Sequence, residues 1–138
     1  MNIQGRERVL TELDHVRLAS LSSRGLRERS LSSQRIDAVL EDARVVPSRR
    51  VGADIVTMYS QVELVDLDTR RRQTLTVCFP GDSEPSAGFI SVLSPVGSGL
   101  LGLKVGAVAR WQMPGGEEGA AEIVAIAYQP EASGDYTR

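Results

Sequence analysis

Few residues in this sequence have the side-chain chemistry of a catalytic or metal-binding centre. His15 is the only histidine and Cys78 the only cysteine. A zinc site typically needs four nitrogen or sulfur ligands, which these two side chains cannot supply. Asp14 precedes His15, but successive helix residues lie about 100° apart, so the two do not share a face. We therefore expect no catalytic residue, no cofactor and no metal, and we interpret His15 as a solvated helix residue.

Two pairs of carboxylates lie where turns are predicted. Asp66 and Asp68 fall in a polar link between two apolar segments, and Glu117 and Glu118 follow a Pro-Gly-Gly turn. Turn formation and solubility explain both pairs better than a general acid–base dyad does. Cys78 alternates with apolar residues of a predicted strand, so we expect a partly exposed thiol. No neighbouring cation would make that thiol reactive, and we interpret it as structural.

Glycines and arginines form two patterns that can bind phosphate. Gly97, Gly99 and Gly102 give G-x-G-x-x-G, the phosphate-cradling pattern of dinucleotide-binding folds. Here no long helix follows, and no acidic partner lies about 20 residues on within a βαβ unit. Close packing of a short helical turn against a sheet explains these glycines better. Arg70, Arg71 and Arg72 cluster at a predicted hairpin tip, where such a run is usually solvated.

The composition is that of an ordinary globular domain. The 138 residues are 41% hydrophobic and 25% charged, with a net charge of −2. This length predicts one compact domain, or a small domain with an appendage. Aromatic residues make up only 4%, which disfavours an aromatic-lined pocket. The charge predicts no direct sequence-specific binding to nucleic acid. Because no run of about 18 apolar residues and no signal-peptide core is present, we expect a cytoplasmic protein with no membrane partner. We also expect a monomer.

Two kinds of segment must position these residues, and they meet near residue 46. Residues 1–46 contain two glycines and no proline, whereas residues 47–138 hold all six prolines and the other eleven glycines. In the first part, apolar residues at helical spacing predict one helix over Arg6–Ser22, including Val9 and Leu10, and another around Ile36–Ala43. A link rich in serine predicts that the two fold back as an antiparallel helical hairpin.

The second part changes to strand periodicity. Alternation of apolar and polar residues predicts about five short strands, with a short helical turn between the third and fourth. The strands are expected at Val62–Leu64, Leu75–Phe79, Phe89–Leu93, Ala107–Met113 and Gly119–Tyr128. The sequence therefore predicts an α+β fold in which residues 47–138 form an antiparallel sheet packed on one short helix.

Several segments resemble a known protein family. They are Ile55–Leu67, Ile90–Gly106, Trp111–Gly116 and Ala127–Tyr136. From about residue 8 to the C-terminus the chain is similar to the Rnk family, the regulators of nucleoside diphosphate kinase. It also resembles, more distantly, the C-terminal domain of Gre-type transcript cleavage factors. The resemblance implies a short antiparallel coiled coil over residues 1–46 and an FKBP-like sheet domain over residues 47–138.

The resemblance also implies a partner, bacterial RNA polymerase, bound at the rim of its secondary channel in competition with Gre-type factors. Effects on nucleoside diphosphate kinase levels would then be indirect. Gre-type factors present two acidic residues at the coiled-coil tip, which help to hold a catalytic magnesium. Here the tip carries Arg24, Arg27 and Arg29 and one acid, Glu28, so that pair is missing. We therefore expect a non-catalytic regulator.

The expected docking residues follow from the same resemblance. Gre-type factors carry Asp-Ser-Pro on the docking face, and this chain has Leu93 followed by Ser94 and Pro95. Together with Gly97 and Leu100, Ser94 and Pro95 are the predicted polymerase-docking residues. A structural explanation stands beside this one, because serine is a good helix cap and proline a good first helical residue.

Two other functions stay open at this stage. The FKBP-like fold hosts peptidyl-prolyl isomerases, although fold alone does not carry function and the scarcity of aromatic residues argues against such a pocket. A Gre-type transcript cleavage factor is the second alternative, against which the arginine-rich tip argues.

Overall fold

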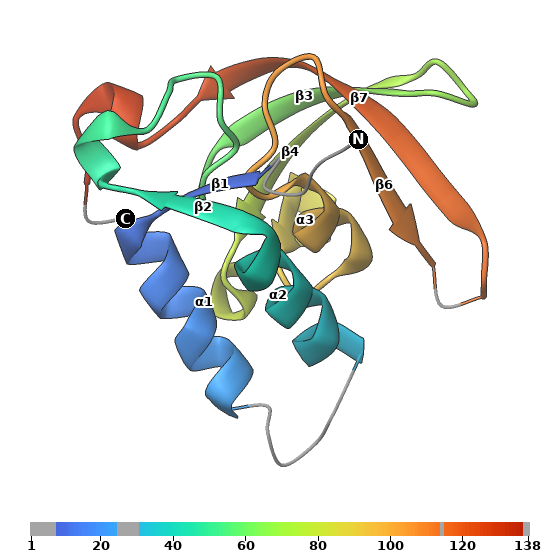
Figure 1. Cartoon of the computed structure of the whole chain (residues 1–138). Coiled ribbons are helices and arrows are strands. Elements are labelled where there is room, and N and C mark those ends of the chain that lie inside the picture. The colour runs from blue at the N-terminus through green and yellow to red at the C-terminus, as the bar shows by residue number, and fades with distance from the viewer. Residues whose placement is uncertain (1–7, 25–30, 114, 137–138) are drawn as a thin grey trace, which may run out of the picture.

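The computed structural model describes residues 8–24, 31–113 and 115–136 and has the α+β fold expected from the sequence (Figure 1). A five-stranded sheet lies beside the short helix α3 (Pro95–Leu100). The longer helices α1 (Glu12–Arg24) and α2 (Leu31–Asp42) lie side by side next to a two-stranded sheet. Within the described ranges, none of the helices is long and apolar enough to cross a membrane.

The helical part begins with a strand that the sequence prediction missed. β1 (Arg8–Thr11) pairs in parallel with β2 (Ala43–Val46). The prediction that Val9 and Leu10 belong to the first helix is therefore wrong. The backbone N–H of Val9 donates to the carbonyl of Gly102 at 2.9 Å, so a partner distant in sequence determines the conformation here. Tertiary contacts override the local helical spacing.

The two predicted helices do form: α1 starts later than predicted, at Glu12, and α2 starts earlier, at Leu31. Thr11 ends β1, and its Oγ1 accepts the backbone N–H of Asp14 at 3.0 Å, which satisfies a donor of the first turn of α1. The inner faces of the helices bury Leu18, Ile36 and Val39 almost completely. The connection between the helices falls at residues 25–30, outside the described residues.

All five predicted strands are present, but the sheet is not entirely antiparallel. Their bounds are β3 (Gln61–Asp66), β4 (Arg72–Cys78), β5 (Phe89–Ser91), β6 (Val108–Gln112) and β7 (Glu118–Tyr128). The strand order is β5-β4-β3-β7-β6, and β5 runs parallel to β4. The antiparallel prediction is wrong at this edge because two short 3-10 turns carry the chain back before β5 begins.

One hydrophobic core joins the helices to the sheet. Leu18 and Ile36 from the helices belong to the same buried cluster as Val62, Leu100 and Ile123. The strand β2 ends at residue 46, where the composition changes. The division into a helical unit over residues 1–46 and a sheet unit over residues 47–138 stays a prediction about domain organisation.

Cys78 is more deeply buried than the sequence predicted. Its exposed fraction is 0%, and its Sγ lies 3.4 Å from the carbonyl oxygen of Ile90, to which it donates. β5 pairs with β4 at this residue, so β4 has a neighbouring strand on this edge and does not form the edge of the sheet. Burial raises the pKa of the Cys78 thiol, which disfavours the reactive thiolate.

Candidate functional site

The predicted docking segment forms the start of α3. Ser94 is the N-cap of this helix, and its Oγ accepts the backbone N–H of Gly97 at 3.0 Å. The Ser94 hydroxyl also donates to the carbonyl of Ser91 at 2.7 Å. Pro95 occupies the first helical position, where a missing N–H costs nothing. The structural explanation for Ser94 and Pro95 is therefore confirmed, and both residues remain half-exposed.

The other two predicted docking residues lie inside the protein. The side chain of Leu100 is 0% exposed, and Gly97 is buried. A β-carbon on Gly97 would overlap the carbonyl oxygen of Ser91 and lie 3.0 Å from the Cα of Val92. In this conformation neither residue presents a side chain to a partner. Their close packing holds α3 against the sheet.

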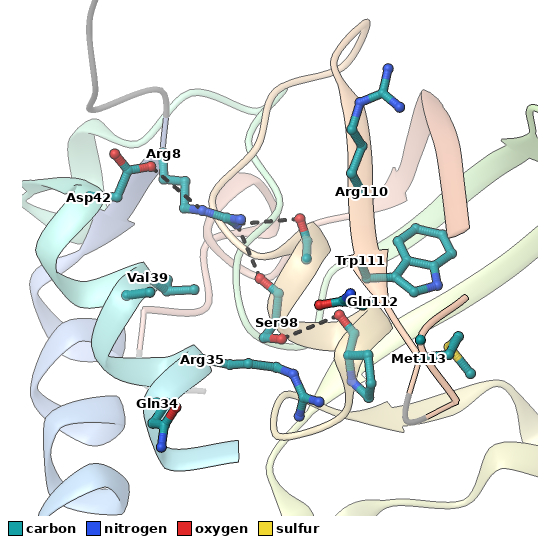
Figure 2. Close-up of a pocket in the computed structure, with 14 residues that line it drawn as sticks. Arg8, Gln34, Arg35, Val39, Asp42, Ser98, Arg110, Trp111, Gln112 and Met113 are labelled. Carbon is teal, nitrogen blue, oxygen red and sulfur yellow. Dashed lines mark hydrogen bonds and ion pairs between the residues drawn. The ribbon is translucent and has the colours of Figure 1, made fainter. Parts of the chain in front are cut away.

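Arg8 fixes the other end of α3 (Figure 2). Its Nη1 donates to the carbonyl of Leu101 at 2.6 Å. The same Nη1 donates to the carbonyls of Ser98 and Gly99 at 3.1 and 3.3 Å. Its Nε lies 3.8 Å from a carboxylate oxygen of Asp42 at the end of α2. We call these contacts the Arg8 clamp. The last carbonyls of a helix lack partners within the helix, so the clamp satisfies groups that would otherwise be orphaned.

Between α2, α3 and the end of β6 lies an open groove of about 830 Å³, which we call the α2–β6 groove. Its lining combines charged, amide and apolar side chains from β1, α2, α3 and β6, together with residues that follow β6. The described residues that line it are Arg8, Gln34, Arg35, Ala38, Val39, Asp42, Pro95, Ser98, Gly99, Arg110, Trp111, Gln112, Met113 and Gly116. Only Pro95 of this set was among the predicted site residues.

Arg35 links the helical part to the predicted docking segment. Its Nη1 donates to the carbonyl of Leu93 at 3.5 Å, a long hydrogen bond. In Figure 2 the Arg35 side chain extends from α2 across the groove toward α3. The sequence gave no signal for this contact, because the two residues are 58 positions apart. Leu93 itself packs against the core.

A second polar cluster lies buried at the base of α1. Asp14 is 0% exposed, and its Oδ2 accepts the backbone N–H of Met58 at 3.1 Å. Its Oδ1 has no hydrogen-bond partner among the described residues. Glu131, also buried, accepts the Thr57 hydroxyl at 2.7 Å. Burial raises the pKa of Asp14 to about 6, and the nearby negative charge of Glu131 adds to this rise.

The remaining residues singled out in the sequence have structural roles or lie outside the described ranges. Asp66 accepts the backbone N–H groups of Asp68 and Thr69 at 2.8 and 2.9 Å, which confirms turn formation. These hydrogen bonds hold the pKa of Asp66 below its usual value. Gly102 has a φ of 83°, which favours glycine. The tip residues Arg27, Glu28 and Arg29 lie outside the described residues, and of Arg24 only the helical backbone is described.

Comparison with known proteins identifies relatives both among sequences and among solved structures. Residues 51–128 match the model of the transcription elongation factor GreA/GreB C-terminal family. The regulator of nucleoside diphosphate kinase from Escherichia coli K12 is 37% identical over 101 residues, which cover 73% of this chain and 74% of that protein. The transcription elongation factor GreA of Clostridium perfringens is 36% identical over 81 residues, or 59% of this chain and 51% of that protein.

The structural comparison extends over most of the described residues. A solved structure of a prokaryotic transcription elongation factor GreA/GreB from Nitrosomonas europaea superposes with a TM-score of 0.73 at 32% sequence identity. The match covers 88% of this chain and 99% of that one. The similarity therefore includes residues from both sides of the composition change at residue 46.

Proposed function

The chain belongs to the GreA/GreB C-terminal family and resembles the regulators of nucleoside diphosphate kinase within it, and from this premise we propose a specific role. It is a transcription-associated regulator that binds bacterial RNA polymerase at the rim of the secondary channel. It acts there without catalysis, competes with Gre-type factors for the same surface, and affects nucleoside diphosphate kinase levels indirectly, through transcription.

The observation that carries this proposal is the extent of the family match. Residues 51–128 include all five strands of the large sheet and the whole of α3. Within this unit, Ser94 and Pro95 lie half-exposed at the start of α3. The N-cap hydrogen bond and the buried Gly97 hold this segment in one conformation, so it is a preformed surface. A rigid surface of this kind suits docking onto a partner that does not change shape.

The charges at the helical tip support a role other than RNA cleavage. The sequence places Arg24, Arg27 and Arg29 around the single acid Glu28. Magnesium prefers carboxylate and water ligands, so one acid among three arginines is a poor metal site. A factor with such a tip, bound at the channel rim, would exclude cleavage factors and would not itself support RNA cleavage.

A pull-down with purified core RNA polymerase tests the proposal. We expect the wild-type protein to be retained and the double variant Ser94→Glu/Pro95→Ala to lose about tenfold or more in affinity. Replacing the cap alters α3 as well as its surface, so the single variant Ser94→Asp is measured beside it. Aspartate keeps an N-cap acceptor and adds a charge to the surface. The aspartate carboxylate cannot donate to the Ser91 carbonyl as the serine hydroxyl does, so Ser94→Asp should unfold a few degrees below the wild type. It should stay folded at the temperature of the binding assay and bind polymerase more weakly.

The matched control is Arg71→Ala in the exposed turn between β3 and β4. This variant should bind polymerase as the wild type does, because the turn lies far from α3 in the sheet (Figure 1). Polymerase binding that is absent in the wild type, or unchanged in the Ser94 and Pro95 variants, would contradict the proposal.

A further inference from the structure

We propose that the α2–β6 groove is a docking site for an acidic segment of a protein partner that carries an apolar side chain as its anchor. In this complex Arg35 pairs with a carboxylate of the partner, while Trp111 and Met113 contact the anchor. The inference goes beyond polymerase docking, because it concerns the groove between the helical part and the sheet. Its test contains no polymerase.

The charges that line the groove favour an acidic occupant. Among the described lining residues there are three arginines and one carboxylate, Asp42, which already lies beside Arg8. Arg8 is engaged with the carbonyls at the end of α3. Figure 2 shows Arg110 extending away from Arg35, so Arg35 is the guanidinium that reaches into the space between α2 and α3. Its long contact with a backbone carbonyl leaves most of its donors for a carboxylate.

The apolar part of the lining favours a protein rather than a small ion. Ala38 and Val39 of α2, Pro95 of α3 and Met113, which follows β6, add apolar groups to the lining of the groove. The Met113 side chain is 41% exposed, so part of this surface is in contact with water. Tryptophan, methionine and arginine are the residue types enriched in the centres of protein interfaces. The volume of about 830 Å³ lies within the range of pockets that enclose a substantial ligand.

The same residues suit a nucleic acid poorly. A single guanidinium directed into the groove neutralises little of a phosphate backbone, whose binding depends on many cationic contacts. Trp111 packs against Gly99 and Gly119, and a β-carbon on Gly119 would overlap its indole nitrogen. One side of the indole is therefore covered, which limits its use for stacking between bases.

The groove lies between the helical part and the sheet. Its walls come from α2 on one side and β6 on the other, with α3 between them (Figure 2). An occupant that contacts Arg35 and Trp111 together would bridge the helical part and the sheet. Because Arg35 also contacts the carbonyl of Leu93, the occupant would compete with or reinforce a contact beside the start of α3.

Titration followed by two-dimensional NMR tests the site with defined probes. The probe is a short synthetic peptide with two leucines flanked by aspartates, and the control peptides replace the aspartates by serines or by lysines. We expect the acidic peptide to shift the amide signals of Ala38 and Gly99 and the indole N–H signal of Trp111. The serine peptide should bind about tenfold more weakly, and the lysine peptide should cause no shifts at these positions.

Charge reversal separates recognition from damage to the fold. Arg35→Glu should abolish shifts with the acidic peptide and allow the lysine peptide to bind, a gain that a misfolded variant would not show. Met113→Ala removes an exposed apolar side chain and should weaken the acidic peptide several-fold. Arg71→Glu, at the turn between β3 and β4, carries the same charge change away from the groove and should behave as the wild type.

Four results would overturn the inference. The first is the absence of shifts with the acidic peptide at millimolar concentration, and the second is equal binding of the serine and acidic peptides. The third is a short single-stranded RNA that causes stronger shifts at the groove than the acidic peptide does. The fourth is a set of shifts at the groove that grows with protein concentration without any peptide, which would assign the surface to a second copy of this chain. Shifts confined to the groove, with preference for the acidic peptide, support it.

Discussion

Replacing Arg8 by methionine tests the energetic importance of the Arg8 clamp. The change keeps an unbranched apolar stem and removes the guanidinium that holds the last carbonyls of α3. Nη1 carries two hydrogens, so it serves two acceptors well, Leu101 at 2.6 Å and one of Ser98 and Gly99 at 3.1 and 3.3 Å. The ion pair with Asp42 is long, at 3.8 Å, and adds little.

The magnitude follows from these contacts. A hydrogen bond to a charged group contributes about 1.5–3 kcal/mol, so two give about 3–6 kcal/mol. The Arg8 side chain is 19% exposed, and water can replace part of the lost contact, which favours the lower end of that range. We expect Arg8→Met to lower the free energy of unfolding by about 3 kcal/mol. For a chain of this size that corresponds to a fall of roughly 10 °C in Tm.

Urea unfolding followed by the fluorescence of Trp111 measures this change, since Trp111 is the only tryptophan. The slope of the free energy against urea concentration should stay the same, because the exposed surface on unfolding is similar. Arg72→Met is the matched control. Arg72 lies 3.7 Å from Glu63 with a side chain that is 72% exposed, and such a pair contributes less than about 1 kcal/mol. A loss of stability in Arg8→Met no larger than in Arg72→Met would show that the Arg8 clamp contributes no more than an exposed ion pair does.

Two further predictions concern buried positions. The pKa of Asp14 is raised to about 6 from 3.8, so the folded state binds a proton more tightly than the unfolded state, and Asp14 lowers stability progressively as the pH rises from about 4 to 6. Asp14→Asn keeps an acceptor for the Met58 N–H and removes the charge, so it should be more stable than the wild type at pH 7.5 by up to about 3 kcal/mol. In urea titrations this difference in the free energy of unfolding should shrink toward pH 4. A difference that does not depend on pH would show that the charge of Asp14 is not its cause. Gly97→Ala places a β-carbon against the carbonyl of Ser91, and this overpacking should lower the free energy of unfolding by about 1–3 kcal/mol. The change would be measured as a fall in Tm. An unchanged Tm would show that α3 can move away from the sheet.

The sequence predicted the elements that depend on local patterns. Alternation placed the five strands, and the serine, proline and glycine pattern placed α3 with Ser94 as its cap. These signals involve residues within four positions of each other, so they can be recognised without knowledge of the fold. The family resemblance, carried by segments such as Ile90–Gly106, was confirmed by the match over residues 51–128.

The features that the sequence did not predict depend on distant partners. Val9 and Leu10 have helical spacing, yet they form a strand because β2 and the Gly102 carbonyl lie beside them. Arg8 lies 93 positions from Leu101, so the Arg8 clamp has no local signature. The burial of Cys78 likewise follows from the parallel strand β5, whose pairing no alternation pattern encodes.

The α2–β6 groove was missed for the same reason. Its residues come from β1, α2, α3 and β6 and from the residues that follow β6. None of Arg35, Trp111 and Met113 is a catalytic residue type at a recognisable spacing. The sequence did direct attention to Pro95, at one margin of the groove, through the family motif. The groove residues are distant from one another in the sequence, so only the folded structure shows that they lie together.

A competition experiment tests whether this protein binds core RNA polymerase at the surface that Gre-type factors use. The affinity of the labelled protein for polymerase would be measured with increasing amounts of an unlabelled Gre-type factor. We expect the Gre-type factor to displace the protein completely, with the apparent Kd rising in proportion to the competitor concentration. Binding to polymerase that persists unchanged at saturating competitor, or the absence of binding altogether, would contradict this expectation.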